Sequence, residues 1–478
     1  MSLSSTTMAA MRFGYGFAPG QDAPRDADAL IAQVQDGADS DVLFPDGGVA
    51  GARARMLDTL AELAEVRKAG DDDKAEMRRA INKRIAAAFA RNGILRVCQA
   101  VVSPTGFNER LATFWCNHFA IGAQKATALR WLAPLYEVEV VRPKLGGSFR
   151  NLLQAAIRHP AMLIYLDQTR SLGPQSAAAK RGGGGLNENL GRELIELHTL
   201  GAEGPYGQGD VRSAALVLTG LTVQRKAMKT TFREARAEPG ELQVLNTAYD
   251  GLPSERRTLA LLDDLADHPA TAQHICRKLV RHFIADDPPE PIVSAMTQVW
   301  KETDGDLTAV YAAMLDHPRS WQEDGAKMKT PFDFVVSGLR ALGAGDGFFD
   351  QQAEAGDEMD ADAAGDGPPE PADRRRNQIR ALTLAALRGM GQPVWLPPSP
   401  AGFSDDSATW LSPSQLSLRI AWARRASGAV ALEQEPRAFL KAALADAARE
   451  NTITLVSRAP DRRTGLALAL ASPEFNRR

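Results

Sequence analysis

Cysteine is scarce in this chain, which has three cysteines among 478 residues. Cys98, Cys116 and Cys276 lie far apart, and their number is odd. They therefore form neither a disulfide framework nor the spacing of a zinc site. Each lies in an apolar or helical stretch, so we expect a small core side chain at each position. Such usage agrees with a reducing compartment.

An excess of charge of one sign is also missing. The net charge of -3 argues against a dedicated nucleic-acid binder, which needs a strongly basic face. No stretch holds about 18 uninterrupted apolar residues, so no membrane-spanning helix is expected. Residues Met1 to Arg12 lack the basic start and apolar core of a secretory signal. We therefore predict a cytoplasmic protein, and export of a longer precursor stays open.

Several common catalytic signatures are absent. The four glycines Gly182–Gly185 are not followed by Lys-Ser or Lys-Thr, so they form no nucleotide-binding P-loop. The segment Gly14–Phe17 lacks the third glycine and the preceding strand of a dinucleotide-binding turn. No Gly-x-Ser-x-Gly elbow and no His-Glu-x-x-His or Glu-x-x-His motif occurs, which argues against a serine hydrolase and a di-iron bundle.

Most of the chain has the pattern of amphipathic helices. Ala, Leu, Arg and Glu dominate, and apolar residues recur at steps of three and four. The pattern predicts a mainly α protein built around a large multi-helix domain. Representative predicted helices are Ala52–Lys68, Lys74–Arg91, Asn108–Ile121, Leu190–Leu200, Ala270–Phe283 and Pro331–Leu342.

One region departs from this pattern. Between residues 218 and 249, Leu221–Gln224 and Leu242–Leu245 resemble short strands among turn residues, which predicts one short β-ribbon. The acidic stretch 344–377 contains few large apolar residues and predicts a flexible insertion or linker. It divides the chain into a main helical domain, residues 1–343, and a C-terminal helical part, residues 378–478, that packs on it.

Three His-Pro pairs recur along the chain. They are His159-Pro160, His268-Pro269 and His317-Pro318. Proline suits the first position of a helix, where its missing N–H does no harm. The pairs therefore predict three helix starts, and the residues after each pair differ too much to indicate an internal repeat.

The densest group of chemically active side chains lies in the run 187–201. At about 100° per residue, Asn189, Glu193 and Glu196 share one face of a helix. His198 lies roughly opposite the two glutamates, so in a regular helix it cannot bind the same metal ion as they do. Asn187 would begin the helix, and Gly201 would end it.

Two interpretations of this run stay open. In the first, Glu188, Arg192 and Glu196 form a ladder of ion pairs that stabilises the helix. In the second, the leucine-rich helix is buried, and its paired carboxylates acquire the split pKa values that acid–base chemistry requires. Arg192 could then hold an anionic group of a substrate with two hydrogen bonds.

Further histidines are weaker candidates. His118 lies among aromatic residues, where a histidine is more often part of the core than of a site. His159 and Asp167 are the other polar residues that we assign to a binding role. The stripe of His274, Lys278 and His282 could receive an anion, but its pattern favours a solvated face near a helix end.

Motifs along nearly the whole chain resemble a family catalogued as the bacterial domain of unknown function 1800. The residues that match it are Arg12-Phe13-Gly14, Phe114–Phe119, His159–Leu163, Tyr165-Leu166-Asp167, Asn187–Gly201, His268–Ala272, Lys278-Leu279, Asp286–Pro289, Lys329–Phe332, Met390–Pro393, Pro397–Pro400 and Ser472–Phe475.

This resemblance implies membership of a family but indicates little about a mechanism. Members are often encoded beside a sulfatase-like protein, and many carry export signals, which this chain lacks. Relatives often have a histidine near the position of Ala237–Gly240, and its absence here puts a role for that loop in doubt.

Three functions are consistent with these observations. The first is a carboxylate- or metal-assisted hydrolase that uses Glu193, Glu196 and His198, with Asn187, Asn189, Arg192, His118, His159 and Asp167 in binding roles. The second is a non-catalytic assembly or maturation protein that holds a sulfatase-like partner. The third is a carrier of a metal or cofactor whose identity the sequence leaves unknown.

Overall fold

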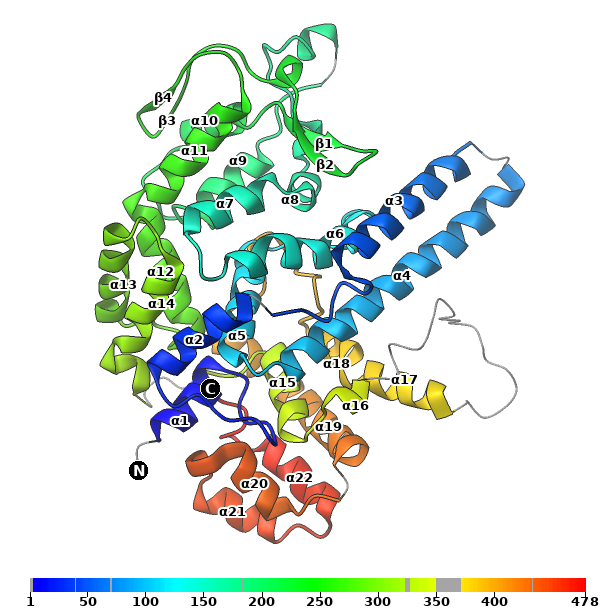
Figure 1. Cartoon of the computed structure of the whole chain (residues 1–478), viewed down its shortest axis with the longest axis vertical. Helices are drawn as coiled ribbons and strands as arrows, with labels where there is room; N and C mark the ends of the chain where they lie inside the picture. Colours follow the sequence, from blue (N-terminus) through cyan, green and yellow to red (C-terminus); the bar gives the residue numbers. More distant parts are fainter. Residues whose placement is uncertain are drawn as a thin grey trace.

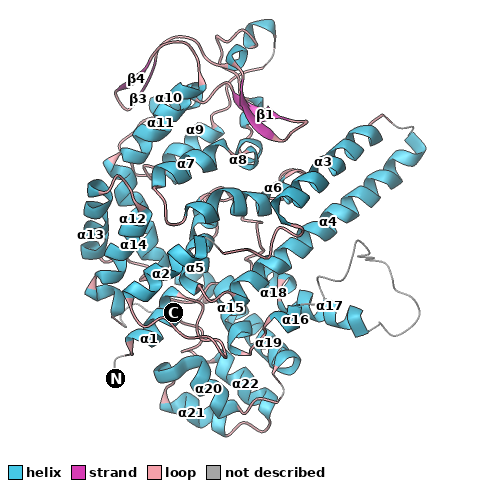
Figure 2. Cartoon of the chain, in the orientation of Figure 1, coloured by secondary structure: helices cyan, strands magenta, loops and turns pink. Residues whose placement is uncertain are grey.

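The computed structural model describes residues 3–38, 40–68, 71–182, 184–322, 327–349, 371–431 and 433–478. Helices make up most of these residues, and the strands form two small antiparallel ribbons (Figure 2). The prediction of a mainly α fold with β structure confined to residues 218–249 is confirmed.

The helices form two groups along the chain, one before the two β-ribbons and one after them. The first group is α1 (Ser5–Met8), α2 (Ala27–Ala38), α3 (Gly48–Val66), α4 (Asp71–Val102), α5 (Gly106–His118), α6 (Leu129–Tyr136), α7 (Phe149–Arg158), α8 (Pro160–Tyr165), α9 (Asn189–Glu193) and α10 (Gln208–Val217). The second group is α11 (Glu255–Asp267), α12 (Pro269–Phe283), α13 (Glu290–Glu302), α14 (Leu307–Asp316), α15 (Pro331–Ala341), α16 (Asp346–Phe349), α17 (Pro371–Leu382), α18 (Leu384–Gly389), α19 (Pro413–Val430), α20 (Pro436–Leu444), α21 (Glu450–Ser457) and α22 (Arg462–Ala471).

All three His-Pro pairs begin helical segments, as predicted. Pro160 and Pro269 open α8 and α12, and Pro318 opens the 3₁₀ turn Pro318–Trp321. In each case the histidine before the proline is the N-cap, because its Nδ1 accepts a hydrogen bond from the backbone N–H two residues further on. The imidazole thus satisfies one of the N–H groups that a helix start leaves without an intrahelical acceptor.

The two strands predicted for residues 218–249 do not pair with each other. β1 (Leu221–Gln224) pairs with β2 (Lys229–Phe232), and β3 (Leu242–Val244) pairs with β4 (Thr247–Tyr249), so the region forms two hairpins rather than one ribbon. The second hairpin turns at Leu245 and Asn246, which both have positive φ, at 47° and 66°. Two such residues in succession form the tight turn that joins adjacent antiparallel strands.

Two hydrophobic clusters organise the packing. The larger one joins α2, α5 to α7 and α10 to α14. The second joins the end of α4 with α15, α17 to α20 and α22. Figure 1 shows α3 and the first part of α4 as a long antiparallel pair that extends away from this body. Because α4 enters both clusters, it connects the N-terminal helices to the C-terminal ones.

One described helix is long and apolar enough to cross a membrane by length and composition alone. It covers Lys74–Val102, with a mean hydropathy of 1.3 in its most apolar window, and 56% of that window is buried inside the protein. A core helix passes the same test, so the observation is weak support for a span. The cytoplasmic location stays a prediction.

The predicted acidic insertion, residues 344–377, lies mostly outside the described residues, as does residue 183 within the four glycines. The division of the chain at this insertion therefore stays a prediction. The second hydrophobic cluster includes both α15, from before the insertion, and α17, from after it.

Candidate functional site

The run 187–201 forms a short helix with a change of geometry in its middle. α9 (Asn189–Glu193) continues directly into a π-helix, Leu194–His198. The Asn187 Oδ1 accepts a hydrogen bond from the N–H of Asn189 at 2.9 Å, which closes the start. Gly201 lies just after the end with a φ of +87°, a conformation that glycine adopts without strain.

The charged side of this helix forms the predicted ladder of ion pairs. The Arg192 guanidinium lies 2.8 Å from Glu196 and 3.5 Å from Glu188. The exposed fractions of the Arg192, Glu196 and Glu188 side chains are 37%, 28% and 27%, so the acidic side chains of the ladder are half-buried rather than fully shielded from water. The physical reason is that Leu190, Leu194 and Ile195 occupy the interior side of the helix.

Glu193 differs from Glu196 in its surroundings. Partial burial raises the pKa of Glu193, the charge of Glu196 raises it further, and Arg192 opposes both. The neighbouring ring is that of Tyr165, whose pKa burial and the Glu193 charge raise to about 12. Glu196, in contrast, is paired directly with Arg192.

The structure separates His198 from the two glutamates. His198 is completely buried, and its ring lies 5.7 Å from that of His118, centroid to centroid. The backbone carbonyls of Leu197 and His198 accept hydrogen bonds from the His274 and His118 rings at 3.2 and 3.3 Å. The histidines thus bind the C-terminal carbonyls of the π-helix, on the side away from the acidic ladder.

Lys278 completes this histidine cluster. Its Nζ lies 3.0 Å from the His118 Nδ1, so an ammonium donor at Lys278 leaves the His118 Nε2–H to donate to the His198 carbonyl. Burial and the Lys278 charge lower the pKa of His198 to about 3 and that of His274 to about 4. Both imidazoles are therefore neutral at pH 7.

The expectation that the 274–282 stripe is a solvated face is wrong. Burial lowers the pKa of Lys278 to about 8, and Asp405 opposes that shift. His282 is 4% exposed, and its Nδ1 lies 2.7 Å from the Asp405 Oδ1. The stripe is buried because the loop that carries Asp405 and the helix α5 that carries His118 pack against α12.

The remaining candidates lie in separate places. His159 caps α8, and its Nε2 lies 3.0 Å from Glu139. Asp167 pairs with Lys125 at 2.5 Å, and Lys125 also donates to the carbonyl of Tyr165. Asp167 is thereby connected to the surroundings of Glu193 through Tyr165, whereas Asn189 is exposed and makes no side-chain contact with another described residue that bears on the site.

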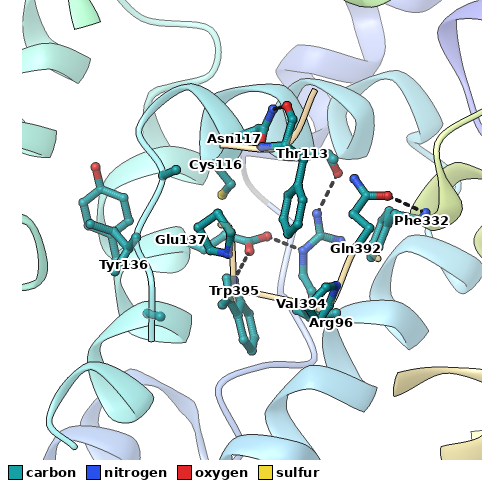
Figure 3. Close-up of a pocket in the computed structure, with 16 residues that line it drawn as sticks. Arg96, Thr113, Cys116, Asn117, Tyr136, Glu137, Phe332, Gln392, Val394 and Trp395 are labelled. Atoms are coloured by element: carbon teal, nitrogen blue, oxygen red, sulfur yellow. Dashed lines mark hydrogen bonds and ion pairs between the residues drawn. The ribbon is translucent and has the colours of Figure 1, made fainter. Parts of the chain in front are cut away.

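A cavity of about 80 Å³ lies beside α5, and no residue of the histidine cluster lines it (Figure 3). We call it the motif cavity, because residues of the family motifs line it. Cys116 and Asn117 come from α5, Phe332 opens α15, and Gln392, Pro393 and Pro397 come from the segment after α18. The other lining residues are Arg96, Thr113, Ala120, Ile121, Ala133, Tyr136, Glu137, Val394, Trp395 and Phe403.

A buried ionic network forms one wall of the motif cavity. The Glu137 Oε1 lies 2.6 Å from the Arg96 Nε and 3.0 Å from the Arg142 Nη2. The Glu137 Oε2 accepts a hydrogen bond from the Trp395 indole at 3.0 Å. Figure 3 shows the carboxylate of Glu137 between Arg96 and Trp395. Both oxygens of this carboxylate are therefore satisfied by the protein itself.

Glu109 balances the second arginine of the network. It accepts two hydrogen bonds from Arg142, at 2.8 and 2.9 Å, and one from Gln99 at 3.0 Å. Burial raises the pKa of Glu109, but Arg142 and Arg96 outweigh it and lower the pKa to about 2. Two carboxylates and two guanidinium groups thus neutralise one another within the protein.

The remaining polar groups of the motif cavity are held in place by neighbouring backbone. The amide side chain of Asn117 exchanges two hydrogen bonds with the backbone of Phe403, at 2.9 and 2.7 Å. The Gln392 Oε1 accepts from the N–H of Phe332 at 2.8 Å. Burial and the nearby Glu137 charge raise the pKa of the Cys116 thiol well above its ordinary value, so it remains protonated.

A family model described as a protein of unknown function, DUF1800, matches residues 8–477. The chain belongs to this family. The family resemblance inferred from the motifs is therefore confirmed. No curated protein and no solved structure matches the chain.

In this DUF1800 chain, the residues that sequence reasoning missed are those around the motif cavity. Arg96, Glu137 and Trp395 stand in no recognisable pattern, and 258 residues separate Glu137 from Trp395. The motifs Phe114–Phe119 and Met390–Pro393 could have indicated this site, because residues of both line the motif cavity. Among the described residues, no three His, Cys, Asp or Glu side chains converge in a way that could hold a metal ion.

Proposed function

We propose that this DUF1800 protein binds a small, mainly apolar ligand in the motif cavity. The observation that supports this proposal is the convergence of α5, α15 and the segment 392–397 on one hollow. A hollow of mostly apolar walls with a few fixed polar groups is the common form of a small-molecule site.

The charges around the motif cavity favour a ligand without net charge. Glu137 is already paired with Arg96 and Arg142, so a charged ligand would add an unbalanced charge in a buried place. A protonated thiol at Cys116 is a poor nucleophile, which favours binding over covalent catalysis. A neutral molecule with one hydrogen-bonding group near Gln392 fits these conditions best.

A cavity-filling variant tests this proposal. Val394→Phe should place a ring in the motif cavity and lower the affinity for neutral fragments of about five to ten heavy atoms by at least tenfold. Leu396→Phe is the matched control, because Leu396 lies two residues further along the same segment and does not line the motif cavity. Binding can be followed by the fluorescence of Trp395 and by fragment-observed NMR. Equal affinities in the two variants and the native protein would contradict the proposal.

A second candidate is the carboxylate-assisted hydrolase centred on Glu193 and Glu196. The unlike surroundings of the two side chains support it, because partial burial raises the pKa of Glu193, whereas Glu196 is paired with Arg192. His198 takes no part in this version, since it lies with His118 in the buried histidine cluster. Metal assistance, and the roles of Asn187, Asn189, Arg192 and Asp167, remain proposals.

Glu193→Gln separates catalysis from a scaffold role. On the hydrolase proposal, it abolishes turnover of chromogenic esters and glycosides while the melting temperature stays unchanged. Glu188→Gln is the control, because it removes a glutamate charge from the same helix without touching Glu193 or Glu196. A fall in melting temperature, or native protein that turns over none of these substrates, speaks for the scaffold.

Binding of a sulfatase-like partner and carriage of a metal or cofactor remain alternatives that rest on the family resemblance and on composition. Co-purification from native cells tests the first, since a stoichiometric sulfatase-like protein should appear. Elemental analysis and an absorption spectrum of the purified protein test the second.

A further inference from the structure

A second hollow lies against the first hairpin and shares no lining residue with the motif cavity. Its volume is about 440 Å³, and we call it the ribbon pocket. Residues of β1 and Thr169 line it, and its cationic residues come from the β1–β2 turn and from the segment after β2. The residues that line it are Thr169, Thr222, Val223, Gln224, Arg225, Lys226, Arg233 and Arg236.

The ribbon pocket contains four cationic side chains and no carboxylate among its lining residues. Arg225, Lys226 and Arg233 are exposed, and their side chains make no hydrogen bond or ion pair with any other residue that the structure describes. In this respect they differ from Arg150, Arg158 and Arg212, which pair with carboxylates. A cluster of like charges with no neutralising partner in the protein favours a bound anion.

Arg236 anchors this cluster. Its Nη2 donates to the carbonyls of Thr169 and Ser171, at 2.7 and 3.2 Å, which fixes the guanidinium beside the pocket. Burial lowers the pKa of Arg236, and the proximity of Arg233 lowers it further. The two guanidinium groups therefore repel each other across a short distance, and an anion between them would remove that repulsion.

Strand geometry adds neutral hydrogen-bonding groups. Thr222 and Gln224 are two residues apart in β1, so their side chains lie on the same face of the hairpin. Both line the ribbon pocket with Thr169. Hydroxyl, amide and guanidinium donors arranged around one concave space match the oxygens of a tetrahedral oxyanion.

We propose that the ribbon pocket binds the phosphate or sulfate group of a small monoester. Guanidinium groups bind such oxyanions with paired hydrogen bonds, and four cations exceed the charge of a single ester group. The bounded shape of the hollow favours a small ester over a polymer. The net charge of -3 for the whole chain points in the same direction, since it gives no extended basic face.

Calorimetric titration with 4-nitrophenyl phosphate and 4-nitrophenyl sulfate tests the proposal, with sodium chloride at matched ionic strength as the background. Arg233→Gln and Arg225→Gln should each weaken binding of the preferred ester by about tenfold or more, because each removes a charge-assisted contact. Both side chains are exposed, so the fold should tolerate the changes. Arg256→Gln is the control, because Arg256 is an exposed arginine that does not line the ribbon pocket.

The pH dependence of binding shows whether the preferred ligand is a phosphate monoester or a sulfate monoester. A phosphate monoester takes up a proton near pH 6, so its binding should weaken between pH 8 and about 5.5, whereas a sulfate monoester should bind equally at both. Either result supports the binding of a monoester in the ribbon pocket. The proposal is overturned by native affinity in Arg233→Gln and Arg225→Gln, by the absence of binding to both esters, or by a clear preference for heparin or duplex DNA with a steep salt dependence. None of these outcomes depends on the motif cavity.

Discussion

The acidic ladder of α9 and the ionic network of the motif cavity are both built from glutamate and arginine side chains, but the two groups differ in burial. In the ladder, Arg192 pairs with Glu188 and Glu196, four residues away on either side, and all three are partly exposed. In the network, Glu109 and Glu137 pair with arginines from other segments, and both carboxylates are at most 2% exposed. The charges that lie close together in the sequence are therefore near the surface. The buried charges come from separate segments of the chain, and only the folded chain brings them together.

The difference predicts unequal costs for removing one partner. Glu109→Ala leaves Arg96 and Arg142 facing a single carboxylate in the interior, so we expect a loss of about 3–5 kcal/mol in the free energy of unfolding. Urea denaturation measures it. Glu196→Ala is the comparison, with an expected loss of about 0.5 kcal/mol or less. Similar losses for the two variants would remove the distinction between network and ladder.

The substitution Trp395→Phe tests the contact between the ionic network and the segment 392–397, which lines the motif cavity. It removes the indole donor to the Glu137 Oε2 and should lower the free energy of unfolding by about 1.5–3 kcal/mol, the usual range for a hydrogen bond to a charged group. The measurement is chemical denaturation at pH 7. A loss near zero would mean that water replaces the indole at no cost, and that the loop is fixed by other contacts.

The buried histidine cluster makes the stability of the fold depend on pH. The pKa values of His198 and His274, about 3 and about 4, lie below the ordinary 6.5, so folding favours their neutral forms. Their contribution is complete above pH 6.5 and is lost as the pH falls toward 3, by about 2 kcal/mol for each histidine at pH 5. Unfolding measured from pH 7 to 5 should show a shallower slope in His198→Phe. An unchanged slope would place the acid sensitivity elsewhere.

The smallest effect concerns the ladder itself. Arg192→Gln removes both ion pairs of the helix, and we expect a loss of only a few tenths of a kcal/mol because the charges remain partly hydrated. Thermal unfolding at low and high salt measures it. A loss above about 1 kcal/mol would show that the ladder is a scaffold in its own right.

Sequence patterns predicted the features that depend on neighbours along the chain. The helical periodicity, the three His-Pro starts and the pairing of Arg192 with Glu196 all arise from spacings of a few residues. The motif cavity could not be predicted, because its residues come from segments as far apart in the chain as Arg96 and Phe403.

Burial was the property most often misjudged from sequence. The leucines of α9 suggested depth, but they take the interior side and leave Glu196 partly exposed. The polar stripe on α12 suggested solvent, but Asp405, 123 residues away from His282, covers it. On α12, the residue that decides burial lies outside the window that a helical pattern samples.

The π-helix at Leu194–His198 has a consequence for the length of this segment. A π turn contains about one residue more than an α turn, so it offsets the helical phase on its two sides. Deleting one residue there and restoring an ordinary turn would rotate Asn189–Glu193 by about 100° relative to the chain beyond His198. Leu190 would then no longer point to the interior, so the spacing of this motif matters as much as its composition.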